Sequence, residues 1–138
     1  MNDARELTQI YEILRQPVHT PDYARIFSIF TSGKNHAIVK WRVDYGRATV
    51  EQIWGDFKGL TSYDPDKCIG LPVESFVDEE SRPKIRGFIQ HALSHGFVAK
   101  KTSIYTESGE IKDISGILYK QSYNVLIELL FDPLGIEL

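Results

Sequence analysis

The sequence has little cysteine and no excess of basic charge. Cys68 is its one cysteine, so no internal disulfide can form, and a lone thiol cannot anchor a zinc cluster. The 16 Lys and Arg residues are outnumbered by 19 Asp and Glu residues, which gives a net charge of −3. Nucleic-acid binding needs a basic surface that neutralises phosphates. We therefore expect no nucleic-acid partner, and a reducing, cytoplasmic location.

The sequence also lacks a long apolar run. One of its longest apolar stretches, 125–131, is much shorter than the ~20 residues that cross a bilayer. Residues 1–6 show neither the basic start nor the apolar run of a signal peptide. We therefore expect no membrane segment. The composition, 42% hydrophobic and 25% charged, is that of a soluble globular protein, and 138 residues make one ordinary domain.

The first 33 residues predict a helical extension. An amphipathic helix is expected over 3–15, and Pro17 ends it. A shorter helix begins at Thr20-Pro21-Asp22 and stops at Gly33. The apolar stripe of the first helix consists of Leu7, Ile10, Tyr11 and Leu14.

After residue 34 the pattern alternates between strands and helices. Strands are expected at 36–44, 49–57, 97–106, 111–120 and 125–131. Residues 58–80 predict short helical turns, and 82–95 predict the longest helix, with Ser81 as its cap and Gly96 at its end. This order predicts an α+β domain built around one antiparallel sheet.

Residues 36–133 resemble a PAS domain with its C-terminal PAC part. The stretch 60–63 (LTSY) with Ile69-Gly70 resembles the family's "TGY…eelxG" pattern, and 76–82 (FVDEESR) resembles the "hPeDr" entry to its long helix. Gly96, Ser108-Gly109 and Phe131-Asp132-Pro133 match later family positions. Each motif is weak alone, and the match rests on their order and spacing.

The resemblance implies a five-stranded sheet of order 2-1-5-4-3 with helices over one face. It divides the chain into the extension, 1–33, and a sensory domain, 34–138. It also implies a non-catalytic sensor that binds a small molecule and signals through dimeric helices to an unidentified output partner. One departure is Trp54-Gly55-Asp56-Phe57, where the family often has an asparagine that could contact a ligand.

A ligand pocket is expected between the sheet and the long helix, with apolar walls that favour an apolar or weakly polar ligand. We interpret both tryptophans as facing inward, where their rings fill the core, line the cavity, or do both. The candidate pocket residues are Trp41, Val50, Trp54, Tyr63, Ile85, Phe88, Ile89 and Ile104.

The sequence indicates no catalytic residue, metal or cofactor. The acidic clusters, 64–66 and 78–80, are interpreted as helix caps or solvated turns. Haem-binding PAS domains take an axial histidine near His95, but a histidine at a helix end needs no ligand. Cys68 precedes Gly70, whereas the flavin-adduct cysteine follows the glycine, so Cys68 is interpreted as a small buried side chain. The alternative function is a cone-shaped enzyme of the ketosteroid-isomerase type.

A homodimer is expected through the first helix. Its stripe is about two turns long, and an isolated helix of that length is marginal in water. It must therefore dock, either on the outer face of the sheet or on the same helix of a second copy. Leu126 and Leu130 are predicted to point outward and to join that interface.

Overall fold

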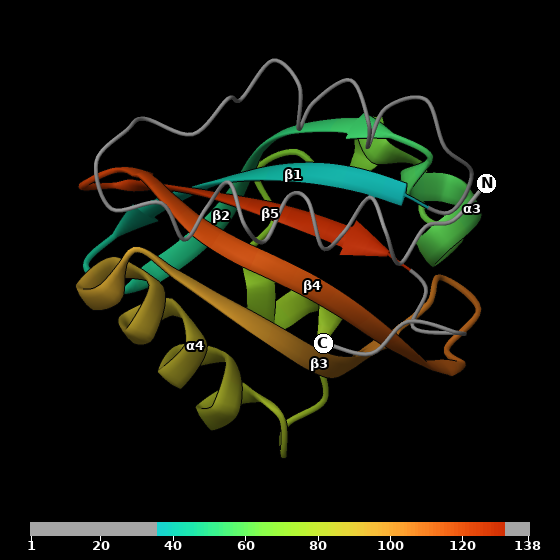
Figure 1. The fold of residues 1–138 in the computed structure, drawn as a ribbon. Helices are drawn as coiled ribbons and strands as arrows, with labels where there is room; N and C mark the ends of the chain where they lie inside the picture. Colours follow the sequence, from blue (N-terminus) through green and yellow to red (C-terminus); the bar gives the residue numbers. More distant parts are fainter. Residues whose placement is uncertain (1–35, 132–138) are drawn as a thin grey trace, which may run out of the picture.

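The computed structural model describes residues 36–131, of Thr102 the backbone only. They form one antiparallel sheet with the strand order β2-β1-β5-β4-β3 (Figure 1). Its strands are β1 (His36–Asp44), β2 (Arg47–Gly55), β3 (Phe97–Tyr105), β4 (Ile111–Ser122) and β5 (Val125–Phe131). The predicted fold class and strand order are confirmed, as is the predicted order of elements within residues 36–131. The predicted extension, 1–33, lies outside the described residues.

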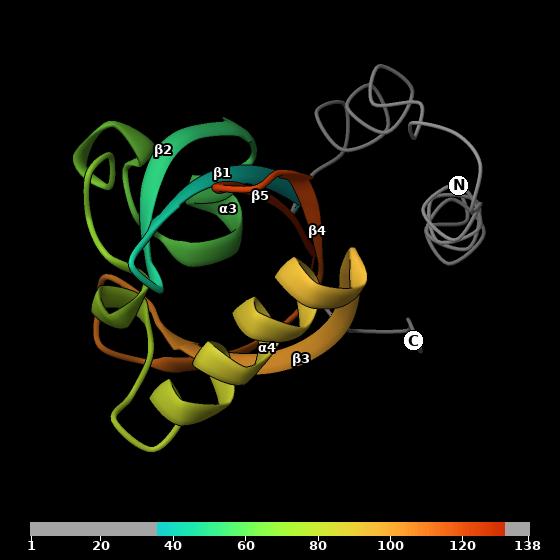
Figure 2. The ribbon, with the colours of Figure 1, turned by 90° about the vertical axis from the view of Figure 1, so that its left-hand side faces the viewer.

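The described helices lie on the concave inner face of the sheet (Figure 2). They are α3 (Phe57–Thr61), the 3₁₀ turns η1 (Pro65–Lys67) and η2 (Val73–Phe76), and α4 (Arg82–His95). Helix α4 packs its buried residues, Ile85, Ile89 and Ala92, into the core. Within residues 36–131, no helix is both long and apolar enough to cross a membrane.

The two ends of α4 compare differently with the prediction. Gly96 ends the helix at a φ of 98°, a conformation that side chains disfavour, and its N–H donates to Ala92, as expected. Ser81 occupies the N-cap position, but its side chain makes no capping hydrogen bond, so that part of the prediction was wrong. Asp78 instead accepts a 2.9 Å hydrogen bond from the Ser81 N–H.

A β-bulge in β2 changes which side chains face the core. Trp41 pairs with Val50 on one side of the irregularity, and Val39 pairs with Ile53 on the other. Glu51 is therefore an extra residue that has no partner in the ladder. Because side chains alternate between faces, one extra residue reverses the faces of everything beyond it.

The bulge makes the prediction for Trp54 wrong. Val50 and Trp54 would share a face in a regular strand, but here Trp54 pairs with Ile38 and lies on the outer face. Ile53 packs against the core instead. The prediction that Trp41 faces inward is confirmed, since this side chain is 6% exposed within the core cluster.

The prediction for β5 was also wrong about its faces. Leu126 pairs with Trp41 and Leu130 pairs with Ala37, and all four belong to the inner core. The reason is that β5 is buried along its whole length, so apolarity cannot distinguish its two faces. The outward residues of β5 are Val125, Ile127, Leu129 and Phe131, which alternate with the inward set.

Candidate functional site

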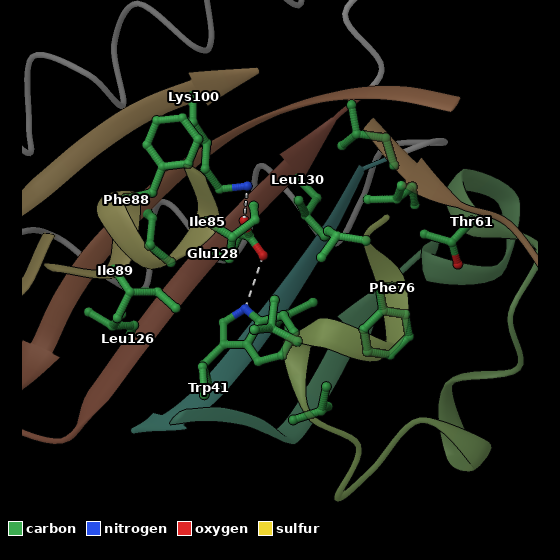
Figure 3. A pocket seen from close by; sticks show the side chains of 18 of the residues that line it. Trp41, Thr61, Phe76, Ile85, Phe88, Ile89, Lys100, Leu126, Glu128 and Leu130 are labelled. Carbon is green, nitrogen blue, oxygen red and sulfur yellow. Dashed lines mark hydrogen bonds and ion pairs between the residues drawn. The ribbon is translucent and has the colours of Figure 1, made fainter. Parts of the chain in front are cut away.

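A cavity of about 60 Å³ lies between the inner face of the sheet and the helices (Figure 3). Its walls are apolar except at Thr61, Lys100 and Glu128. Six predicted residues line it: Trp41, Val50, Ile85, Phe88, Ile89 and Ile104. The sequence interpretation missed these lining residues: Val39, Ala48, Phe57, Thr61, Val73, Phe76, Val77, Lys100, Ile114, Leu118 and Glu128. Leu126 and Leu130, assigned from the sequence to an outer interface, also line it.

Two predicted pocket residues lie elsewhere. Trp54 is on the outer face beyond the bulge. Tyr63 stands behind Phe76, which lines the cavity, and meets it edge to face with ring centroids 5.4 Å apart. Burial raises the pKa of the Tyr63 phenol. Phe76 also meets Trp41 edge to face at 6.3 Å, so these aromatic rings form one continuous wall.

The polar feature of the cavity is a buried ion pair. The Lys100 ammonium contacts Glu128 Oε2, and the two side chains are 5% and 7% exposed. Trp41 donates a 3.0 Å hydrogen bond from its indole Nε1 to Glu128 Oε1. Figure 3 shows the carboxylate held between the ammonium and the indole. Each oxygen of Glu128 thus has a donor, which a buried carboxylate requires.

The absence of a side chain at Gly116 leaves space for this ion pair. Lys100 is on β3 and Glu128 is on β5, so the pair must meet across β4, where Gly116 pairs with Lys100. A Cβ atom at Gly116 would lie 3.2 Å from the Leu129 carbonyl oxygen and 3.6 Å from Glu128 Oε2. A side chain at this position would therefore crowd the backbone of the neighbouring strand and would touch the carboxylate.

The sequence carries a signal for one half of the pair. Glu128 is the one charged residue in the otherwise apolar stretch 125–131, and an acid in a strand covered on both faces must have a buried partner. No local pattern marks Lys100, because a lysine in a strand is usually solvated. The partner could be found only from the register across β4.

The Thr61 hydroxyl makes its hydrogen bonds at the C-terminal end of helix α3. Its hydroxyl donates a 2.8 Å hydrogen bond to the Phe57 carbonyl and accepts one from the Tyr63 N–H at 3.2 Å. The hydroxyl hydrogen is therefore not available to a ligand. The donors that face the cavity come from the ion pair instead.

The histidines of α4, Cys68 and Asp64 lie outside the cavity. His91 and His95 are exposed on α4, with their rings stacked 4.3 Å apart. In the part of the chain that the structure describes, no group of three or more His, Cys, Asp or Glu residues is placed to hold a metal ion. Cys68 is buried as predicted, and burial, followed by the nearby Asp64, raises the pKa of its thiol. Asp64 caps η1, as expected of an acidic cap.

Solved structures with this fold are similar to the chain, whereas no family model and no curated protein matches it. One is the PAS domain of a protein from Colwellia psychrerythraea, at 17% identity and a TM-score of 0.62, covering 80% of this chain and 95% of that one. Another is a domain of a sensory box sensor histidine kinase/response regulator from Geobacter sulfurreducens, at 7% identity and a TM-score of 0.64, covering 80% and 93%.

A third similar structure is the PAS domain, in complex with ethanol, of a LuxR-family transcriptional regulator from Burkholderia thailandensis. Its identity is 13% and its TM-score 0.62, with 77% of this chain and 95% of that one covered. The TM-scores of these three structures establish the shared fold. An antiparallel sheet whose inner face carries the helices and a cavity defines an α+β domain of this fold class. In particular, residues 36–131 form a PAS-like domain, as the sequence motifs indicated.

Proposed function

We propose that this chain is a non-catalytic sensor module that binds a small ligand in the cavity and passes the signal on through a homodimer. The observation that supports it is an apolar cavity with one buried ion pair inside a PAS-like fold. Ligand cavities of sensors combine apolar walls with a few placed polar groups. Similar folds occur in a sensor histidine kinase/response regulator and a transcriptional regulator, which fits an output partner downstream. The module would belong to bacterial signalling in the cytoplasm.

The site favours a sensor over an isomerase-type enzyme. An acid–base enzyme needs a carboxylate that can reach a proton of the substrate. Glu128 lies in the cavity, but its two oxygens already accept from the Trp41 indole and the Lys100 ammonium. A carboxylate engaged in this way serves as a fixed polar anchor rather than as a general base.

We place the dimer contact on the outer face of the sheet. Leu126 and Leu130 line the cavity and cannot take part, so the outward set of β5, with Ile127 and Leu129 at its centre, replaces them. These side chains are buried, yet the helices within 36–131 all lie on the opposite face. The proposed cover is the 1–33 extension of one or both copies, through the stripe Leu7, Ile10, Tyr11 and Leu14.

Xenon tests whether the cavity admits a ligand. In the full chain with labelled methyl groups, xenon should shift the NMR signals of Ile89 and Leu118, which line the cavity. The signals of Ile117 and Ile127, on the outer face, are the internal control and should stay in place. If the cavity signals do not respond more than the control signals, the binding proposal fails. An absorption spectrum with a Soret band or flavin absorbance would overturn the expectation of no cofactor.

Deleting residues 1–16 tests the dimer. Sedimentation equilibrium of the full chain should give the mass of a dimer, and the truncated chain should give a monomer or lose solubility, because an apolar face is uncovered. A truncated chain with unchanged mass and solubility would contradict the proposed interface.

A further inference from the structure

The buried ion pair leaves hydrogen-bond donors that face the cavity. A lysine ammonium has three N–H donors, and Glu128 Oε2 accepts from Lys100. Among residues 36–131, Glu128 is the only partner of this ammonium. The Lys100 side chain is 5% exposed and its residue lines the cavity, so its other donors lie at the cavity wall and away from bulk solvent. A ligand with an acceptor atom would satisfy them.

The charge of the site selects against ions. Lys100 and Glu128 are the only cation and the only anion among the described residues that line the cavity, and together they are neutral. A bound carboxylate would place two anions against one cation within apolar walls, and a bound amine would place two cations against one anion. Either arrangement leaves an uncompensated charge in a region of low dielectric constant.

The size of the cavity limits the ligand. One water molecule needs about 10–15 Å³ of such space, so a cavity of about 60 Å³ has room for about four to six non-hydrogen atoms. Apolar residues surround this space, among them Phe88, Ile89 and Leu126. Most atoms of the ligand must therefore be carbon.

We propose that the cavity selects a small neutral molecule with one hydrogen-bond acceptor, such as a ketone, an ether or an alcohol, and that Lys100 donates to that acceptor. The inference rests on the proposed function, because it assumes that the cavity binds a ligand. Trp41 and Glu128 position the ammonium: the indole holds one oxygen of the carboxylate, and the other oxygen holds Lys100. The polar group of the ligand would thus lie at the β3–β5 end of the pocket.

Three probes with the same number of non-hydrogen atoms separate these features. Butan-2-one has the carbonyl oxygen, 2-methylbut-1-ene has a CH₂ group in place of that oxygen, and propanoate carries a negative charge. Titrations of the full chain are followed by NMR of labelled methyl groups and of the Lys100 Nζ. Butan-2-one should shift the Nζ signal and the alkene should not. Propanoate should bind at least about tenfold more weakly than butan-2-one.

Variants test whether Lys100 causes the preference for the ketone over the alkene. In a Trp41→Phe background, which removes the indole N–H that would lose its acceptor with Glu128, the double variant Lys100→Met/Glu128→Leu leaves no ammonium, indole or amide donor at this end of the cavity. The ratio of the alkene Kd to the ketone Kd should then fall by about tenfold or more. Lys101→Met makes the same change at the next, exposed residue of β3 and should leave the ratio unchanged. A ratio that the double variant does not lower overturns the role of Lys100, while binding in the cavity stands.

The other outcomes are also decisive. If neither neutral probe binds to the wild-type chain although xenon does, this inference fails and the proposed function survives. If xenon also fails, both fail. If propanoate binds more tightly than butan-2-one, the selection for neutral ligands is wrong. If the double variant does not fold, the Lys100 Nζ signal of the wild-type chain decides, because a ketone that leaves it unmoved overturns the proposal.

Discussion

Removal of one partner of the Lys100–Glu128 pair should destabilise the domain far more than removal of both. Lys100→Met keeps an apolar stem of similar length but leaves the Glu128 carboxylate buried with the Trp41 indole as its remaining donor. Breaking a buried ion pair in this way costs about 3–5 kcal/mol. This is a large fraction of the stability of a domain this size.

A second substitution tests the reason for that cost. Glu128→Gln removes the charge and keeps an oxygen that can accept from Trp41 Nε1. In the wild-type background this change should destabilise, because Lys100 loses its counter-ion. In the Lys100→Met background it should stabilise, because it removes an uncompensated charge. The sign of its effect therefore depends on whether Lys100 is present, and the coupling between the two positions should reach at least about 2 kcal/mol.

Urea unfolding followed by circular dichroism supplies the four free energies of unfolding that this cycle needs. Lys101→Met, an exposed lysine on the same strand, is the control and should change stability by less than about 0.5 kcal/mol. A Lys100→Met cost below about 1 kcal/mol would mean that the pair is solvated. An effect of Glu128→Gln with the same sign in both backgrounds would refute the argument that charge compensation sets the cost.

Three further predictions concern other parts of the domain. Gly116→Ala should lower the free energy of unfolding by about 1–3 kcal/mol, because its Cβ would lie 3.2 Å from a backbone carbonyl oxygen of β5. The control is Gly87→Ala on α4, where a Cβ meets nothing within 4 Å, and it should raise the free energy of unfolding by up to about 1 kcal/mol. Equal effects of the two substitutions in urea unfolding would contradict the packing argument. Cys68 should react with a thiol reagent at least about tenfold more slowly in the native chain than in urea, since burial raises its pKa; equal rates would contradict its burial. Arg42 lowers the pKa of Glu51 below its usual 4.5, so this exposed pair should stabilise the chain slightly above that pH and lose this contribution as the pH falls through the lower folded-state pKa. A Glu51→Gln chain that keeps the full acid-dependent drop in urea midpoint would contradict this assignment.

The sequence determined the secondary structure because its signals are local. The two-residue alternation of Val39, Trp41 and Val43 identified β1 and its inward face, and both were confirmed. The apolar run of β5 and the Gly96 stop of α4 were equally readable, since each depends on neighbours in the chain. Together with the order of weak motifs, these signals were enough to predict the fold and six of the nineteen residues that line the cavity.

Tertiary structure decided what depends on register. The bulge at Glu51 places Trp54 on the outer face, and the residue types of β2 do not predict this bulge. In β5, apolar residues on both faces concealed which set lines the cavity, so Leu126 was assigned to the wrong side. Lys100 and Glu128 are 28 positions apart in the sequence. They meet because β4 lies between their strands and has a glycine at the crossing point. Contacts of this kind are set by strand pairing across the sheet, which local patterns in a single chain do not encode.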